Sequence, residues 1–114
     1  MKLRIRGNSL TLRVSKTELA KLAETGKVED AMRFSSEQSL RYAIEVRPTG
    51  AVTAAFSGAE ILVTLPKARL DLWLRPTEVS VEGSQPIGGG KVLQLVLEKD
   101  GAHVRHGGED DSVA

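Results

Sequence analysis

The chain has 114 residues, of which 40% are hydrophobic and 27% are charged, and its formal net charge at pH 7 is +1. These values are typical of one soluble globular domain, and no apolar run approaches the ~20 residues that a membrane-spanning helix needs. The chain has no cysteine, which excludes disulfides, thiolate metal sites and a cysteine nucleophile. The first residues lack the apolar segment of a signal peptide, so we expect a cytoplasmic protein without membrane contacts.

The basic residues are concentrated near the start of the chain. Residues 1–50 contain 10 lysines and arginines and 6 acidic residues, and the first 17 residues contain five basic groups and no acid. Such asymmetry occurs at anion-binding faces, and it also occurs on ordinary solvated surfaces. Both interpretations stay open at this point.

A β-hairpin is predicted at the start of the chain. Lys2–Arg6 and Ser9–Val14 both alternate polar and apolar residues, and Gly7-Asn8 lies between them. Two residues that tolerate positive φ between alternating segments favour a two-residue hairpin turn. In the register that this turn sets, one face is apolar and the other carries the basic side chains Lys2, Arg4, Arg6 and Arg13.

A helix and two strands follow the hairpin. Ser15-x-x-Glu18 is a capping box, which predicts a helix that begins there and ends near Gly26. Alternation predicts strands at residues 27–34 and 40–47. Within the first of these strands, Asp30 interrupts the apolar face, and the sequence offers no reason for it.

The second half repeats the first. Residues 52–79 match the hydrophobic pattern of residues 1–28 at an offset of 51 without a gap. This predicts a second hairpin around Gly58-Ala59, a short helix after Pro66, and a short strand at 78–81. A loose loop at 83–90 and a last strand at 92–98 complete the pattern.

The repeat predicts the fold class and the domain organisation. We expect an α+β fold, mostly antiparallel β, with tandem ββαββ units that form a pseudo-twofold barrel with two short helices, because closure removes exposed strand edges. The barrel would be a single domain over residues 1–100, built of the repeats 1–47 and 51–100. Residues 101–114 lose the apolar period and are predicted to be a disordered tail.

The basic face of the first hairpin is the main candidate binding site. A row of cations on one strand pair can neutralise phosphates along duplex DNA. The basic side chains would contact phosphates, namely Lys2, Arg4, Arg6 and Arg13. The polar residues Asn8 and Ser9 would position the turn. The alternative is an edge strand that is charged to prevent aggregation. The equivalent positions of the second hairpin carry no basic residue.

Two apolar residues suggest a protein partner. Leu72 lies outside the predicted buried face of the second helix, and Leu62 lies on the face of its strand that is polar in the first unit. An exposed apolar patch there would bind a protein partner or form a homodimer, whereas a strand that is buried on both sides would need no partner. The sequence favours neither the exposed patch nor the strand that is buried on both sides.

The remaining motifs do not indicate chemistry. Gly88-Gly89-Gly90-Lys91 lacks the spacing and the following helix of a phosphate-binding loop, so a hairpin loop is expected. His103 and His106 lie in the predicted tail, where no partner residues support a specific metal site. No catalytic constellation is evident, so we expect no cofactor, no metal and no enzymatic activity.

The segment Gly7–Lys16, followed by a helix, resembles the swapped-hairpin motif of AbrB-type regulators and MazE-type antitoxins. The second unit has a similar segment, Ile61–Lys67, with the proline that such motifs contain and that Ser15 replaces in the first unit. The resemblance implies a barrel built of two such units. It also implies DNA binding through the first hairpin, by Arg4, Arg6, Asn8, Ser9 and Arg13.

The whole chain also resembles a small uncharacterised bacterial family, whose members begin with a similar Met-Lys-Leu-Arg-Ile-x-Gly-Asn-Ser segment and carry a stretch like Leu97–Asp100. The sequence therefore predicts a non-enzymatic binding module, with duplex DNA as the leading ligand. A protein–protein interaction domain is one alternative. A small-ligand-binding barrel that uses the glycine loop is another.

Overall fold

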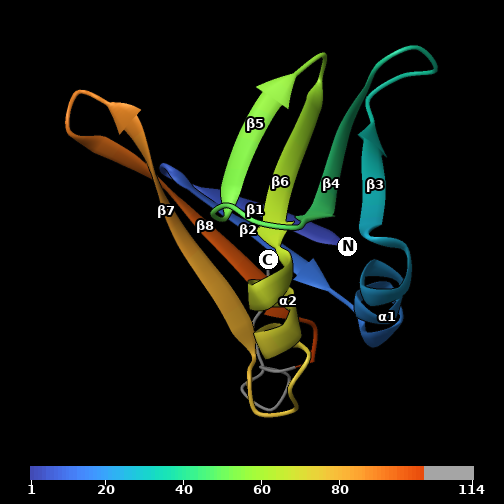
Figure 1. The fold of residues 1–114 in the computed structure, drawn as a ribbon. Helices are drawn as coiled ribbons and strands as arrows, with labels where there is room; N and C mark the ends of the chain where they lie inside the picture. The colour runs from blue at the N-terminus through green and yellow to red at the C-terminus, as the bar shows by residue number, and fades with distance from the viewer. Residues whose placement is uncertain (102–114) are drawn as a thin grey trace.

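The structure, a computed structural model, describes residues 1–101, in which it has eight strands and two helices (Figure 1). The first half contains β1 (Lys2–Arg6), β2 (Ser9–Val14), α1 (Lys16–Thr25), β3 (Lys27–Arg33) and β4 (Ser39–Arg47). The second half contains β5 (Thr53–Ser57), β6 (Glu60–Pro66), α2 (Lys67–Trp73), β7 (Ser80–Gly88) and β8 (Lys91–Lys99). The α+β class, the predominance of strands and the two helices are confirmed.

The strands form two four-stranded sheets that have equivalent strand orders. Sheet A has the order β1-β2-β8-β7, and sheet B has the order β3-β4-β6-β5. Each sheet therefore combines a strand pair from one half with a strand pair from the other half. The outer pairs are antiparallel as predicted, but the central pairs β2–β8 and β4–β6 are parallel. The sheets are mixed because the hairpin of each half lies beside the last strand of the other half: β2 lies beside β8, and β6 lies beside β4.

Both predicted hairpins are present, each with a two-residue turn. In the second turn, Gly58 and Ala59 both have positive φ, at 57° and 62°, as a type I′ turn requires. In the first turn, Gly7 has a φ of 57° and Asn8 stays outside the left-handed region. The turns are equivalent in position and register, but they differ in backbone conformation.

The capping box that was predicted for α1 is confirmed. The Ser15 Oγ accepts a hydrogen bond from the Glu18 N–H at 3.1 Å, and the Glu18 Oε1 accepts one from the Ser15 N–H at 2.9 Å. The helix ends at Gly26, which has a φ of 84° and suits this left-handed position. By contrast, α2 begins after Pro66 without a side-chain cap.

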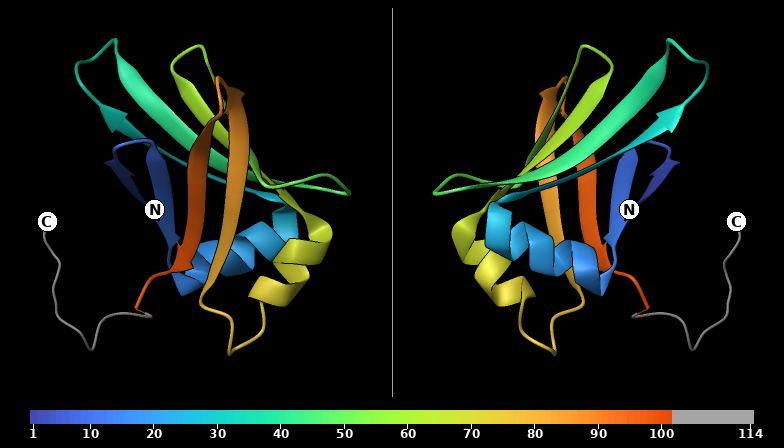
Figure 2. Two further views of the ribbon diagram at one scale, coloured as in Figure 1. Left: turned by 90° about the vertical axis from the view of Figure 1, so that its left-hand side faces the viewer. Right: turned by 90° about the vertical axis from the view of Figure 1, so that its right-hand side faces the viewer.

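The core lies between the inner faces of the two sheets, and the helices close one end of it. Both helices lie at the same end of the sheets, whereas the hairpin turns lie at the other (Figure 2). The largest completely buried side chain is Trp73 of α2, whose Nε1 donates a hydrogen bond to the Val79 carbonyl at 3.3 Å. Around it are the buried side chains of both halves, among them Leu12, Val14, Leu22, Ile44, Val63, Leu65, Leu95 and Leu97.

The predicted closed barrel is wrong. Within residues 1–101, no backbone ladder joins β1 to β3 or β5 to β7, so the sheets remain separate. The strands of the two sheets diverge from the helical end toward the hairpin turns (Figure 1). Side chains bridge the gap instead: across β5 and β7, the Gln85 side-chain amide bonds the N–H and the carbonyl of Ala54, at 2.7 and 3.1 Å. We call the two gaps, β1–β3 and β5–β7, the seams.

The strand predicted at 78–81 is present but starts later and is much longer than expected, so the loose loop predicted at 83–90 is wrong. β7 runs from Ser80 to Gly88 and pairs with β8 along its length, with a register shift between Pro86 and Gly88. Pairing with the apolar strand β8 imposes strand structure on residues with low intrinsic strand preference. The tail predicted over 101–114 lies outside the described residues, apart from Gly101.

Candidate functional site

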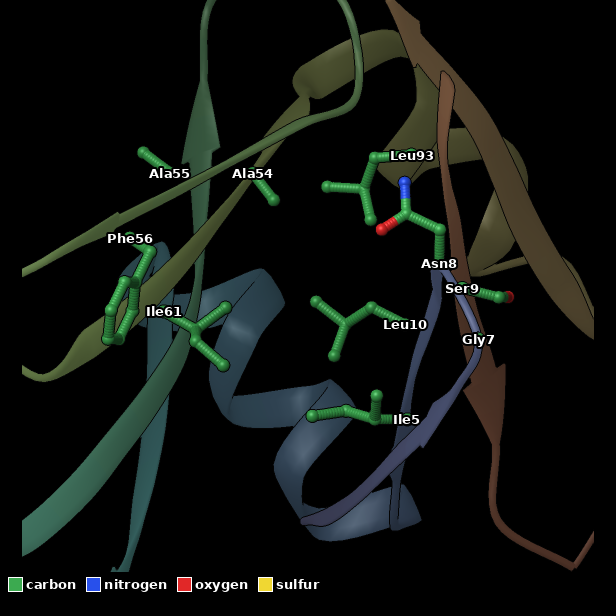
Figure 3. A pocket seen from close by; sticks show the side chains of 10 residues that line it. All are labelled: Ile5, Gly7, Asn8, Ser9, Leu10, Ala54, Ala55, Phe56, Ile61 and Leu93. Atoms are coloured by element: carbon green, nitrogen blue, oxygen red, sulfur yellow. The ribbon is translucent and has the colours of Figure 1, made fainter. Parts of the chain in front are cut away.

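The end of the molecule opposite the helices contains a cavity of about 250 Å³ between the two sheets (Figure 3). It lies between the two equivalent hairpins, so its lining repeats at the offset of 51 residues: Ile5 corresponds to Phe56, and Leu10 to Ile61. Ala54, Ala55 and Leu93 complete the apolar part of the lining. We call this space the apolar cleft.

The side chains at the mouth of the apolar cleft are exposed although they belong to the inner faces of the sheets. Ile5 is 64% exposed and Phe56 is 70% exposed. Phe34, which directly follows β3, and Ile87, near the end of β7, are also exposed. Inner residues near the helices are buried, so this exposure results from the divergence of the sheets. Gathered apolar groups of this kind mark binding sites.

The cleft owes part of its space to Ala54. The equivalent residue in the first hairpin is Leu3, which is larger and packs against the core. The Ala54 side chain points into the cleft (Figure 3), while its backbone is held by Gln85. A small residue on a fixed strand therefore keeps this side of the cleft open.

The two polar turn residues predicted to contact DNA have different positions. The Asn8 Nδ2 donates to the Val92 carbonyl at 2.8 Å, and the Asn8 carbonyl accepts from the Gln94 N–H at 3.1 Å. Asn8 thus fixes the first turn to β8, and its Oδ1 faces the cleft (Figure 3). Ser9 points away from the cleft.

The predicted basic row lies on the outer face of β1 and β2, in the predicted register. Two of its four cations have acidic partners: Arg13 pairs with Glu98 at 3.2 Å, and Lys2 lies 3.8 Å from Asp100. Arg4 and Arg6 are exposed, and neither side chain has a hydrogen bond or an ion pair to another residue within 1–101. Arg4 and Arg6 are thus the cations available to a ligand.

The two residues predicted as a partner surface lie on different elements. Leu62 is half-buried on the outer face of β6, where its cross-strand neighbours are Ala43 and Ala55. Leu72 is 44% exposed on α2. The exposure of Leu72 agrees with the hypothesis of an exposed patch. Leu62 is only partly exposed, so it lies between that hypothesis and a strand buried on both sides.

A cluster around the first residue explains Asp30. The Met1 ammonium donates to the Glu18 Oε2 at 2.6 Å and to the Asp30 Oδ2 at 3.1 Å. The Tyr42 hydroxyl donates to the Met1 carbonyl at 3.4 Å. Asp30 interrupts the apolar face of β3 because it binds the start of β1 at the base of the β1–β3 seam.

The charges of this cluster shift one another's pKa. Burial disfavours charge on the Met1 ammonium, but hydrogen bonds to Glu18 and Asp30 outweigh it and raise the pKa above the ordinary 8.0. Burial alone would raise the pKa of Glu18, but hydrogen bonds from the Met1 ammonium and the Ser15 N–H lower it below 4.5. The Ala31 N–H and then the Met1 ammonium lower the pKa of Asp30. Burial and the two carboxylates raise the pKa of Tyr42.

The glycine run and the metal-binding motif can be compared with the described part of the chain. Gly89-Gly90 is the turn between β7 and β8, so the glycine run is a hairpin loop rather than a phosphate loop. Residues 1–101 contain no group of three or more His, Asp or Glu side chains placed to hold a metal ion. No helix among these residues has the length and apolar character to cross a bilayer. His103 and His106 lie outside the described residues.

The comparisons with known proteins identify a family but not an activity. A family model described as a family of unknown function (DUF7009) matches residues 1–114. The chain belongs to this family. The predicted likeness to an uncharacterised family is thus confirmed, whereas no match shows an AbrB-type or MazE-type relative. No curated protein and no solved structure matches the chain.

The sequence pattern of this member of the family does not reveal the apolar cleft. The apolar alternation of β1 and β5 places Ile5 and Phe56 on the inner sides of their strands, but it does not show that they are exposed. A signal was present in the sequence: large apolar residues stand next to both turns at equivalent positions, while Leu3 is replaced by Ala54. Their exposure follows from the angle between the sheets, which the alternation does not encode.

Proposed function

We propose that this protein is a non-enzymatic binding module whose main site is the apolar cleft, and that the cleft receives apolar side chains of a partner protein. The observation that carries the proposal is the exposure of Ile5 (64%) and Phe56 (70%) on facing inner surfaces of a cavity of about 250 Å³. Covering each such side chain would contribute about 1.5–3 kcal/mol. Covering both side chains would therefore favour the bound state.

The size of the cleft favours protein side chains over a large cofactor. Pockets for drug-sized ligands and cofactors have volumes of about 300–1,000 Å³. The apolar cleft, at about 250 Å³, is smaller than this, and its lining includes the first hairpin turn. It therefore suits one or two apolar side chains that are presented by a larger partner.

A substitution that fills the cleft tests whether the cleft is a binding site. Ala54→Leu copies the equivalent Leu3 of the first hairpin and should occupy the space without removing the backbone bonds to Gln85. We expect the wild-type protein to bind an apolar fluorescent probe, such as anilinonaphthalene sulfonate, and Ala54→Leu to lose most of that binding. Ala23→Leu, on the exposed side of α1, is the matched control and should bind the probe like the wild type. Equal probe binding by all three folded proteins would exclude the cleft as the site.

Duplex DNA is the second candidate ligand, and the exposure of Arg4 and Arg6 without partners in residues 1–101 favours it. Binding would depend strongly on salt, because phosphate contacts release counterions. The double variant Arg4→Gln/Arg6→Gln should lose DNA binding in a low-salt titration. Arg13→Gln should lose less, because Arg13 is already paired with Glu98. Absence of a complex at low salt would rule out this candidate.

A further inference from the structure

The two seams are equivalent in the repeat, but they are closed differently. Leu10 and Ile61 are equivalent residues of the two hairpins. Leu95 of β8 lies opposite Leu10, and Tyr42 of β4 lies opposite Ile61, so Leu95 and Tyr42 are also equivalent. The strand pairs β3–β4 and β7–β8 therefore correspond at an offset of 53 residues. At this offset, Met32 of β3 occupies the position of Gln85 of β7.

This difference leaves the edge of β1 uncovered. Gln85 satisfies the outward N–H and carbonyl of Ala54 at the β5–β7 seam. The equivalent residue of β1, Leu3, lies opposite Leu12 as Ala54 lies opposite Val63, so its backbone groups also point out of the sheet. A methionine has no amide to bond them, and within residues 1–101 no other group does so. Such a row of unpaired backbone groups is a template for an added strand.

The side chains around this edge define what would bind there. On the inner side, Ile5 is 64% exposed, Met32 is 48% exposed and Phe34 is 65% exposed. On the outer side, Arg4 and Arg6 project from the same strand and have no acidic partner in residues 1–101. Directly opposed side chains of neighbouring strands interact, and opposite charges are favourable there. The edge is therefore complementary to a strand that is apolar on one side and acidic on the other.

We propose that β1 binds an extended segment of a partner protein as a fifth strand of sheet A, in the seam between β1 and β3. The segment alternates apolar and acidic residues. Its backbone pairs with Leu3 and Ile5, its apolar side chains enter the open end beside Met32 and Phe34, and its acidic side chains lie next to Arg4 and Arg6. The inference rests on the proposed function, because the apolar half of the segment contacts Ile5, which also lines the apolar cleft.

A peptide titration tests the proposal. The probe is a fluorescein-labelled octapeptide of alternating valine and glutamate, and its binding to the full-length protein is measured by fluorescence anisotropy. We expect saturable binding that weakens with salt. An analogue in which alternate amides are N-methylated keeps its side chains but loses hydrogen-bond donors, and should bind about tenfold more weakly. A valine–lysine octapeptide should not bind, because its cations would face Arg4 and Arg6.

Two substitutions at one position give a matched pair of variants. Met32→Gln places at the β1–β3 seam the residue that closes the other seam, so it should bond Leu3 and weaken octapeptide binding about tenfold. Met32→Leu keeps an apolar side chain without an amide, so it should bind the octapeptide clearly more tightly than Met32→Gln does. Thermal unfolding of both variants verifies that they fold.

The outcomes separate this inference from the proposed function. If the N-methylated peptide binds as tightly as its parent, or if Met32→Gln and Met32→Leu behave alike, strand addition is wrong. If no octapeptide binds but the apolar probe still responds to Ala54→Leu, strand addition is wrong and the cleft remains a binding site. If neither binds, both proposals are wrong. If duplex DNA binds and the octapeptide does not displace it, the basic face binds DNA rather than an acidic segment, and the inference is overturned.

Discussion

At the residue scale, Gly83 shows how closely the two sheets approach at the base of a seam. A Cβ atom at Gly83 would lie 2.9 Å from the Cβ of Val52 and 3.2 Å from the Val52 carbonyl oxygen. Contacts this short with a strand that is held by Gln85 cannot be relieved by a side-chain rotation. Glycine is therefore needed here for close approach, and not for a special backbone angle.

Gly83→Ala should destabilise the protein by about 1–3 kcal/mol, because the added methyl group forces the sheets apart. Urea unfolding with a far-ultraviolet circular dichroism signal measures this loss. Ser84→Ala, at the next and exposed position of β7, is the control and should change the stability by less than about 0.5 kcal/mol. A Gly83→Ala protein as stable as the control would contradict the close contact.

The carboxylates around Met1 should make the stability depend on pH in the acidic range. The folded-state pKa of Glu18 lies below its ordinary value of 4.5, so the charged form contributes stability above that value. This contribution is lost as the pH falls through the lower, folded-state pKa, and Asp30 acts in the same direction. We expect the free energy of unfolding to decrease on acidification below about pH 4.5.

Urea unfolding at a series of pH values tests this dependence. Glu18→Gln cannot titrate, so its stability should vary less with acid pH than that of the wild type. The stability contributed by the Met1 ammonium depends on pH in the opposite direction. Because its pKa is raised, this contribution is complete below pH 8.0 and is lost as the pH rises through the folded-state pKa. Identical acid profiles for the wild type and Glu18→Gln would show that the cluster does not stabilise the fold.

At the scale of elements, α1 depends on the capping box and α2 depends on packing. Ser15 and Glu18 exchange hydrogen bonds at the start of α1. α2 has only seven residues and no side-chain cap, so the complete burial of Trp73 holds it in place. Short helices are marginal in isolation, and tertiary contacts supply most of their stability.

Ser15→Ala should cost about 1 kcal/mol, because the Glu18 N–H loses its acceptor. Chemical denaturation measures the loss. Ser36→Ala, in the exposed turn after β3, offers a control of the same chemistry and should be nearly neutral. Equal stabilities of the two variants would mean that the capping box contributes nothing.

Much of the element order was predictable, because hairpin turns and helix caps are local signals. Gly7-Asn8, Ser15-x-x-Glu18 and Gly26 each act on residues within a few positions. The parallel pairing of β2 with β8 was not predictable, because no local signal marks a partner 85 positions away. The length of β7 was missed for the same reason, since β8 imposes it.

The candidate site was predictable only in part. The register of the first hairpin gave the basic face, but the sequence did not show that Glu98 and Asp100 occupy two of its cations. Those acids lie on β8 and just after it, and their position depends on the parallel pairing. The apolar cleft and the β1 edge depend on the divergence of the sheets, which is a property of the assembled halves.

At the scale of the whole molecule, neither half contains a complete sheet. Leu12 and Val14 of β2 are buried completely, and their strand lies beside β8 of the other half. Ile44 of β4 is buried in the same way beside β6. The halves are therefore interdependent, as expected for two units that share one core.

Separate peptides covering residues 1–50 and 51–114 should not unfold cooperatively as monomers, because each lacks the strands that cover its own core residues. Mixing them should restore strand-rich circular dichroism and a cooperative thermal transition. Sedimentation of each peptide alone identifies self-association. A monomeric half with a cooperative transition of its own would show that the exchange of strand pairs is dispensable.

The strand exchange also sets the order in which the sheets can be completed during synthesis. Sheet B has all its strands once the ribosome has released Pro66, but sheet A must wait for Lys99. Until then the nascent hairpin β1–β2 has no neighbour, and the edge of β2 that will hold β8 stays open to wrong partners. Loop closure over such a separation is slow, so the nascent chain is most vulnerable to aggregation after sheet B has formed and before β8 emerges.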